Sequence, residues 1–296
     1  MTLIKKILLI AGLILPSITN ALPITKTDVL FIVDESASMN TEHAWIAGMA
    51  ANLQTALVGA GVTDNRYGLV GYVENTGAHG PGSAGPHKHQ LNGADWGTAA
   101  NLSTSLTPGL TTSGSSLEDG YEAISYGLNN YTFRADAALN VILITDEDRD
   151  NTNAAITFAS VLAELAGKNA LLNAVINNPF KNASNVAALG IDSDHNAYVA
   201  NGTGGFIASA GGIIGNGAGT TETDYVPLAL QSGGAAWDLN KLRAGGNSAI
   251  SFTAAFVDIK VQEIVNQDPV GVPAPATLIL FGLGLLSFGV IRRPLN

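Results

Sequence analysis

The stretch that decides the fold is DVLFIVDESASM, residues 28–39. Five consecutive apolar residues, 29–33, are rich in β-branched and aromatic types, which is typical of a strand buried on both faces of a parallel sheet. Three oxygen-bearing side chains, Asp34, Ser36 and Ser38, then follow at alternate positions where the strand gives way to a helix. Because Mg²⁺-type ions prefer oxygen ligands, the stretch predicts a divalent-cation site at the carboxyl end of this strand.

A second buried strand is predicted at residues 139–145, LNVILIT, and Asp146 follows it directly. Four of the five residues 146–150 are acidic, and carboxylates this close together repel one another unless a cation or Arg149 offsets their charge. The alternative for this segment is a solvated acidic turn that caps the next helix. That alternative suits Asp148 and Asp150 better than Asp146, which directly follows the strand.

The D-x-S-x-S pattern after an apolar strand resembles the metal-ion-dependent adhesion site of von Willebrand factor type A domains. In that family a hydroxyl residue that follows a glycine, five residues ahead of another glycine and just before a helix, supplies a third direct oxygen. Ser115 has this spacing to Gly120, ahead of a helix predicted at 117–128, although the family usually has Thr there. Ser116 is the alternative ligand, and both serines also have the spacing of a helix capping box.

The resemblance covers about residues 27–265, apart from a glycine-rich and asparagine-rich segment at 177–225 that we interpret as an insertion. It implies a doubly wound, mostly parallel α/β sheet flanked by helices. It also implies one divalent ion, Mg²⁺ with Mn²⁺ or Ca²⁺ as alternatives, and leaves one coordination position for an acidic group of a protein or polysaccharide partner. The ligands that the resemblance implies are Asp34, Ser36, Ser38, Ser115 and Asp146.

The remaining body of the chain alternates between strand-like and helix-like patterns, as a doubly wound sheet requires. Strands are expected at 66–74, 171–176 and 235–238, the last at an edge of the sheet, and helices at 44–57, 153–165 and 252–265.

The N-terminus has the pattern of a secretory signal peptide at residues 1–21. Lys5 and Lys6 form its charged start, residues 7–15 its apolar centre, and small residues precede a cleavage point after Ala21. An uncleaved anchor is the less favoured alternative, because the apolar run is short for a membrane span.

Residues 272–296 follow a short linker, 266–271, and resemble the PEP-CTERM sorting signal of Gram-negative bacteria. A proline-flanked motif precedes an apolar segment, 276–291, and two arginines, although Ala274 stands where the family has Glu. The resemblance implies recognition by an exosortase, a transient membrane anchor through the apolar segment, and delivery across the inner membrane to the cell surface or extracellular matrix. The alternative is a plain C-terminal membrane anchor.

Composition excludes several classes of function. The chain has no cysteine, so disulfides, thiol chemistry and cysteine-bound zinc are excluded. Of its 14 basic residues, four lie in the two terminal signals, which leaves 10 basic and 24 acidic residues, a net charge of −14, between them. A body this acidic argues against nucleic acid as a partner and is compatible with divalent cations.

Three loop histidines, His79, His87 and His89, could bind a transition metal, but solvated side chains are the favoured interpretation. The D-x-D-x-N spacing at 192–196 fails as an EF-hand because Ala197 and Thr203 stand where glycine and glutamate are needed, so a single surface Ca²⁺ site is what remains there. No catalytic motif or organic cofactor site is present, and we expect a binding protein rather than an enzyme. The alternatives are a metal-assisted hydrolase with Asp146 or a histidine as base, and a structural matrix component with a vestigial metal site.

Overall fold

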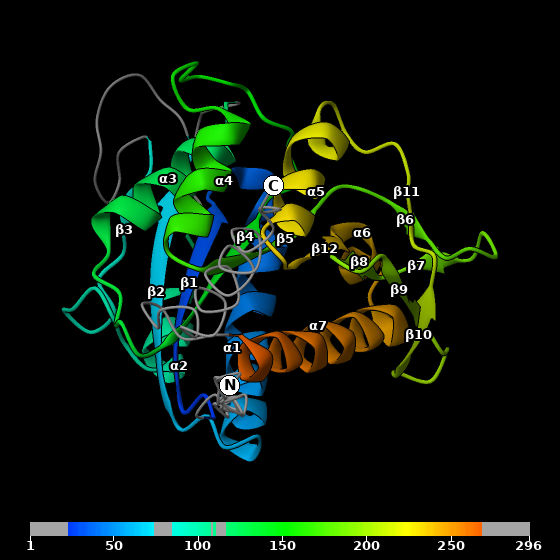
Figure 1. Cartoon of the computed structure of the whole chain (residues 1–296), viewed down its shortest axis with the longest axis horizontal. Helices are drawn as coiled ribbons and strands as arrows, with labels where there is room; N and C mark the ends of the chain where they lie inside the picture. The colour runs from blue at the N-terminus through cyan, green and yellow to red at the C-terminus, as the bar shows by residue number, and fades with distance from the viewer. Residues whose placement is uncertain (1–22, 74–84, 108, 111–116, 268–296) are drawn as a thin grey trace, which may run out of the picture. The chain divides into compact units, whose positions relative to one another are not determined.

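The computed structural model describes residues 23–73, 85–107, 109–110 and 117–267 (Figure 1). Residues 23–271 belong to one compact unit. The predicted signal peptide, the sorting segment 272–296 and both candidate serines, Ser115 and Ser116, lie outside the described residues. In the part of the chain that is described, no helix is both long enough and apolar enough to cross a membrane.

A nine-stranded sheet forms the centre of this unit, with the order β10-β9-β8-β12-β5-β4-β1-β2-β3. The five strands from β12 to β2 run parallel, and the order β3-β2-β1-β4-β5-β12 is that of a doubly wound α/β fold. The predicted fold class is confirmed. The strands of this sheet are β1 (Lys26–Asp34), β2 (Asp64–Tyr72), β3 (His87–Lys88), β4 (Ala138–Ile144), β5 (Ala170–Ile176), β8 (Gly190–Asp192), β9 (Asn196–Ala200), β10 (Phe206–Ala210) and β12 (Ala235–Asp238).

Helices cover both faces of the sheet (Figure 1). One face carries α1 (Asn40–Gly59), α2 (Ala99–Ser105), α6 (Leu239–Arg243) and α7 (Gly246–Asn266), and a short 3₁₀ turn, η1 (Ala37–Met39), leads into α1. The other face carries α3 (Gly120–Asn130), α4 (Phe158–Gly167) and α5 (Thr221–Gln231).

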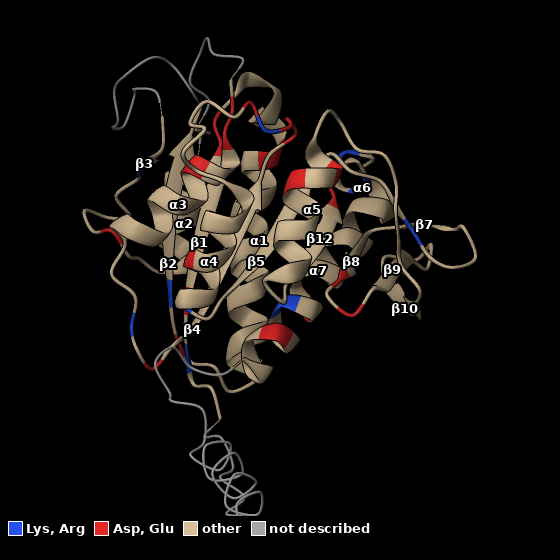
Figure 2. Ribbon diagram, turned by 45° about the horizontal axis from the view of Figure 1, so that its top comes forward, with Lys and Arg blue, Asp and Glu red and all other residues tan. Residues whose placement is uncertain are grey.

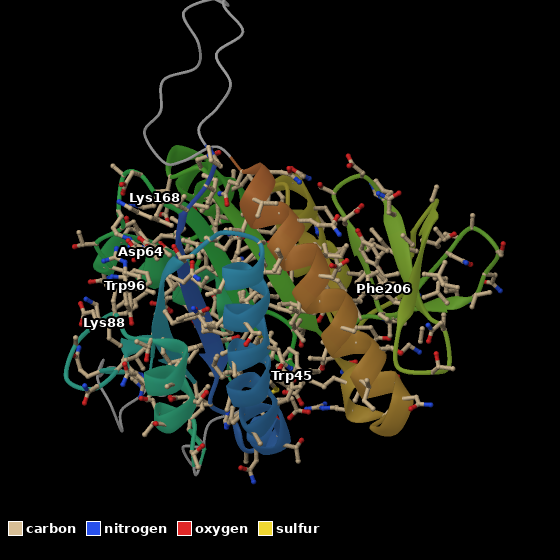
Figure 3. The ribbon with its side chains drawn as sticks, turned by 90° about the horizontal axis from the view of Figure 1, so that it is seen from below. Trp45, Asp64, Lys88, Trp96, Lys168 and Phe206 are labelled. Atoms are coloured by element: carbon tan, nitrogen blue, oxygen red, sulfur yellow. The ribbon has the colours of Figure 1, made fainter. Side chains whose placement is uncertain are left out.

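The apolar run of β1 is buried on both faces because its side chains alternate between two cores. Val29, Phe31 and Val33 pack into the core beneath α1 and α7, whereas Leu30 and Ile32 pack beneath the helices on the opposite face. Figure 3 shows α1 and α7 side by side from below, with Trp45 between them. Its ring lies 5.5 Å and 5.9 Å, centroid to centroid, from two phenylalanine rings of α7, Phe252 and Phe256.

The segment predicted as an insertion adds strands to the structure. β8, β9 and β10 extend the main sheet, while β6 (Phe180–Lys181), β7 (Ala187–Ala188) and β11 (Ile213–Ile214) form a second, three-stranded sheet. The prediction that residues 235–238 form an edge strand is therefore wrong, because β12 lies between β5 and β8.

The segment that carries the predicted loop histidines also contains a strand. β3 pairs antiparallel with β2, and His87 lies opposite Gly71 in the register. A strand of two residues gives no periodic pattern in the sequence, which is why it was not expected.

Candidate functional site

The two predicted acidic ligands end neighbouring strands. Asp34 is the last residue of β1, and Asp146 follows β4 by two residues, with β1 and β4 paired in parallel. The chain leaves β1 towards β2 on one side and reaches β4 on the other, so the strand order reverses here, where doubly wound sheets form their binding crevice. Figure 2 shows acidic residues, in red, gathered in the loops above the upper ends of these strands.

Four of the five predicted ligands lie together. The backbone N–H of Ser36 donates to Oδ1 of Asp34 over 2.7 Å, which holds the turn after β1. The hydroxyls of Ser36 and Ser38 lie 2.9 Å apart, and the Ser38 hydroxyl donates to Oδ1 of Asp146 over 3.0 Å. We call these four residues the all-oxygen site; the fifth predicted ligand, Ser115, lies outside the described residues.

The spacing of the oxygens fits a small octahedral cation. Mg²⁺–oxygen bonds of about 2.0–2.1 Å place adjacent ligand oxygens about 2.9 Å apart. The two hydroxyl contacts above are hydrogen bonds of about this length, 2.9 Å and 3.0 Å, so an ion could replace them with little movement of the oxygens. Ser38 is exposed whereas Asp34 is fully buried, so one side of the group is open to solvent.

Asp34 is fixed from several directions. Thr145, at the end of β4, donates its hydroxyl to Oδ2 of Asp34 over 2.9 Å. His43 of α1 donates from Nε2 to the carbonyl of Asp34 over 2.9 Å, and its Nδ1 accepts from the backbone N–H of Leu110. Burial raises the pKa of Asp34 to about 6, and repulsion from Asp146 contributes to the increase. The hydrogen bonds from Ser36 and Thr145 act in the opposite direction and lower the pKa.

The negative charge around the all-oxygen site extends beyond the predicted ligands. Glu118 is almost fully buried, and burial together with the charges of Asp34, Glu147, Asp150 and Asp146 raises its pKa to about 8. Burial is the larger cause of this shift and the neighbouring carboxylates add to it, so a bound cation would offset the negative charge around Glu118.

Arg243 of α6, rather than Arg149, supplies the positive charge at Asp146. Its guanidinium donates to Oδ2 of Asp146 over 2.9 Å and to Oε1 of Glu42 over 2.7 Å. Arg149 instead forms an ion pair with Asp119, which is also the N-cap of α3. Of the two offsets that the sequence leaves open for the acidic turn, a cation or Arg149, the arginine is held at the start of the neighbouring helix and not at Asp146.

A second group of side chains that can bind metal ions contains Glu35, which directly follows Asp34, and two histidines, His87 and His89. Nε2 of His89 lies 2.6 Å from Oε1 of Glu35, and Nε2 of His87 lies 3.3 Å from Oε2 of the same carboxylate. The two Nε2 atoms are 3.1 Å apart. The prediction of solvated histidines is wrong for these two, since the side chain of His87 is 1% exposed and that of His89 is 20% exposed; His79 lies outside the described residues.

The charges within this group, which we call the Glu-His-His cluster, stabilise one another. Burial acts to raise the pKa of Glu35, but the interactions with the two histidines beside it together outweigh burial and lower the pKa. Burial acts to lower the pKa of His87, yet its interaction with Glu35 raises it above the ordinary value. The signal available in the sequence was the spacing of two between the histidines, which places both on one side of an extended chain.

At residues 192–196, where the sequence left a surface Ca²⁺ site open, the carboxylate oxygens of Asp192 accept hydrogen bonds from neighbouring residues. Oδ1 of Asp192 accepts from the backbone N–H groups of Asp194 and Asn196. Its Oδ2 accepts from Asn196 and from the hydroxyl of Tyr198. Asp192 therefore acts as the hydrogen-bond centre of the turn between β8 and β9.

Comparison with known proteins identifies the C-terminal segment. Residues 271–293 match the family model described as the PEP-CTERM protein-sorting motif, despite Ala274 in the acidic position. A search of curated proteins finds no match.

Two of the solved structures that match the chain are distant in sequence. An aerotolerance-related membrane protein from Bacteroides fragilis NCTC 9343, carrying multiple mutations to serines, is 14% identical with a TM-score of 0.42, over 81% of this chain and 98% of that chain. Proximal thread matrix protein 1 from the mussel byssus, crystal form 2, is 14% identical with a TM-score of 0.36. This alignment covers 53% of the present chain and 38% of the byssus protein.

The sorting motif is thus the part of the chain that these comparisons assign. It implies export, processing by an exosortase, and association with the cell surface or the extracellular space.

Proposed function

We propose that the chain is an exported binding module, of the von Willebrand factor type A kind, that acts at the cell surface or in the extracellular matrix. A divalent cation, Mg²⁺ in the first instance, would be held by the all-oxygen site together with Ser115. This cation engages an acidic group of a protein or polysaccharide partner. The observation that carries the proposal is the meeting of Asp34, Ser36, Ser38 and Asp146 at the point where the strand order reverses.

The charge of the body explains why a cation would be needed. Between the two terminal signals the chain carries a net charge of −14, so it repels an acidic ligand at long range. A cation with one free coordination position removes that repulsion locally and forms a direct bond to a carboxylate or sulfate oxygen. Binding should therefore depend on the divalent cation.

The contacts of Asp146 favour binding over hydrolysis. One of its carboxylate oxygens accepts from Ser38 and the other from Arg243, which holds the side chain within the all-oxygen site, and no catalytic motif accompanies it in the sequence. A vestigial site is disfavoured because the full D-x-S-x-S pattern is retained and its side chains lie together.

The test is retention of the purified full chain on immobilised polyuronate, with immobilised dextran as the neutral control. We expect retention in Mg²⁺ and loss in chelator. Asp34→Asn should lose retention in Mg²⁺, while Asp194→Asn, which removes the same charge at an exposed turn, should keep it. Retention that is equal in chelator, or equal for Asp34→Asn, would contradict a cation-mediated contact.

A protein partner is tested by separating a matrix extract on a blot and probing the blot with the wild-type chain and the same two variants. The predicted pattern is again a signal that needs Mg²⁺ and Asp34 together. Binding to both the polyuronate and the blot that is equal with and without Mg²⁺ would show that the acidic group is not bound through a cation.

A further inference from the structure

The Glu-His-His cluster carries a second inference, which goes beyond the proposed function because it uses none of the residues of the all-oxygen site. Glu35, His87 and His89 each direct one ligand atom into a common space, and these atoms lie within 4.8 Å of one another. The carboxylate comes from the turn after β1, and both imidazoles come from β3 and the residue that follows it.

The carboxylate is buried without full hydrogen bonding. Glu35 is fully buried, and its Oε2 has no hydrogen-bond partner among the described residues. An ionised carboxylate removed from water needs compensating charge and ligands. The two Nε2 atoms that face it lie 3.1 Å apart, a separation that needs a hydrogen on at least one of them or a cation between them.

A backbone contact fixes the orientation of one imidazole. Nδ1 of His87 lies 3.0 Å from the carbonyl oxygen of Gly85, so this nitrogen carries the hydrogen and donates it. In the neutral imidazole Nε2 is then the free acceptor, and it faces Glu35 and His89. Metal-binding histidines use the same second contact to set the tautomer and the direction of the ligand nitrogen.

The sheet leaves room for the cluster at Gly71 of β2. A Cβ at this position would lie 2.3 Å from Oε1 of Glu35 and 2.6 Å from Nε2 of His89, closer than side-chain atoms approach one another. Gly71 is also the residue paired with His87. The cluster therefore occupies space that only a glycine in this strand provides.

The separations fit tetrahedral coordination. Zn²⁺ bonds of about 2.0–2.1 Å to nitrogen and oxygen place neighbouring ligand atoms about 3.3–3.4 Å apart. The two separations that involve His87, 3.1 Å and 3.3 Å, are close to this value. The third, 2.6 Å between His89 and Glu35, is a hydrogen bond that an ion would replace, and the partly exposed His89 is the ligand with freedom to move outwards.

From these contacts we infer that Glu35, His87 and His89 bind a divalent transition-metal ion, Zn²⁺ foremost, with a fourth position open to water or a small anion. Two imidazoles and one carboxylate form the donor set of open zinc sites, whereas Mg²⁺ and Ca²⁺ prefer oxygen alone. The ion would fasten the edge strand β3 to the turn that carries Asp34 and Glu35.

The first test is a competition titration of the metal-stripped full chain with Zn²⁺ and a chromophoric chelator. We expect one Zn²⁺ per chain, and at least about a 10-fold loss of affinity in Glu35→Gln and in His89→Gln. His195→Asn is the matched control, because His195 is an exposed turn histidine in a left-handed conformation that Asn also adopts. Affinity unchanged in both cluster variants would overturn the inference.

The second test needs no variant and so does not depend on how the variants fold. X-ray absorption at the zinc edge of the loaded wild-type chain should show scattering from two imidazole rings; an oxygen-only spectrum would overturn the inference. The Ser38→Ala chain separates the two sites: it should lose its response to Mg²⁺ and keep the affinity for Zn²⁺. A Zn²⁺ affinity that falls with Ser38→Ala would show that zinc occupies the all-oxygen site instead.

Discussion

Removal of the buried charge at Asp34 should have opposite consequences with and without a divalent cation. The pKa of this carboxyl is raised from 3.8 to about 6, so the folded chain holds the proton more tightly than the unfolded chain. Between about pH 4 and pH 6, stability without cation should therefore fall as the pH rises. Above pH 6 the ionised carboxylate costs about 3 kcal/mol, at about 1.4 kcal/mol for each pKa unit.

Asp34→Asn removes this cost and keeps most of the local hydrogen bonding. The amide oxygen still accepts from Ser36, while the contact with the hydroxyl of Thr145 is disturbed, at a cost of about 1 kcal/mol. In chelator at pH 7.5 the variant should thus be more stable than the wild type by about 2 kcal/mol. In Mg²⁺ at about 100 times its dissociation constant, the wild type should gain about 2.7 kcal/mol and the variant nothing, which reverses the order.

Urea unfolding of the full chain, followed by circular dichroism in chelator and in Mg²⁺, measures both values. Asp194→Asn is the charge-matched control and should follow the wild type in each condition. If Asp34→Asn is less stable than the wild type in chelator, the buried charge does not carry the cost that we assign to it. If the variant gains as much from Mg²⁺ as the wild type, Asp34 does not hold the cation.

Three further predictions concern other parts of the chain. Asp28→Ala should lower the free energy of unfolding by about 2–3 kcal/mol, because the buried carboxylate accepts charged hydrogen bonds from Arg66 and Arg134, although Arg134 keeps its ion pair with Asp64; urea unfolding measures the loss. Gly71→Ala should abolish Zn²⁺ binding, since the added methyl group occupies the space of the Glu-His-His cluster; unchanged zinc affinity would contradict this placement. Deletion of residues 272–296 should release the protein from the membrane fraction of the producing cell, and a truncated chain that stays there in a fractionation blot would argue against this segment as the sorting signal.

The parts of the fold that the sequence predicts well are those with a local pattern. The run Val29–Val33 contains only apolar side chains because β1 is covered on both faces, and β4, which is also buried throughout, is apolar apart from Asn140. The all-oxygen site follows from these strands, because a residue that ends a parallel strand must lie at one edge of the sheet. The sequence alone therefore predicts that Asp34 and Asp146 lie close together.

The contacts that were not expected join residues far apart in the sequence or depend on very short strands. Arg243 reaches Asp146 because α6 follows β12 at the same edge of the sheet, and no spacing in the sequence marks that pair. Glu35 occupies a variable position of the metal motif, and its partner His87 lies in a strand of two residues. The sequence does not predict β10 because its side chains are partly or fully exposed, which weakens the apolar signal.

The position of the cation can be measured by anomalous diffraction from crystals of the full chain grown in Mn²⁺, which substitutes for Mg²⁺ at oxygen sites. We predict a manganese peak bonded to the hydroxyls of Ser36 and Ser38, beside the carboxylates of Asp34 and Asp146, with Ser115 completing the group. Crystals that contain Mn²⁺ at saturating concentration but show no peak there, with Arg243 still bound to Asp146, would contradict a cation site at this edge of the sheet.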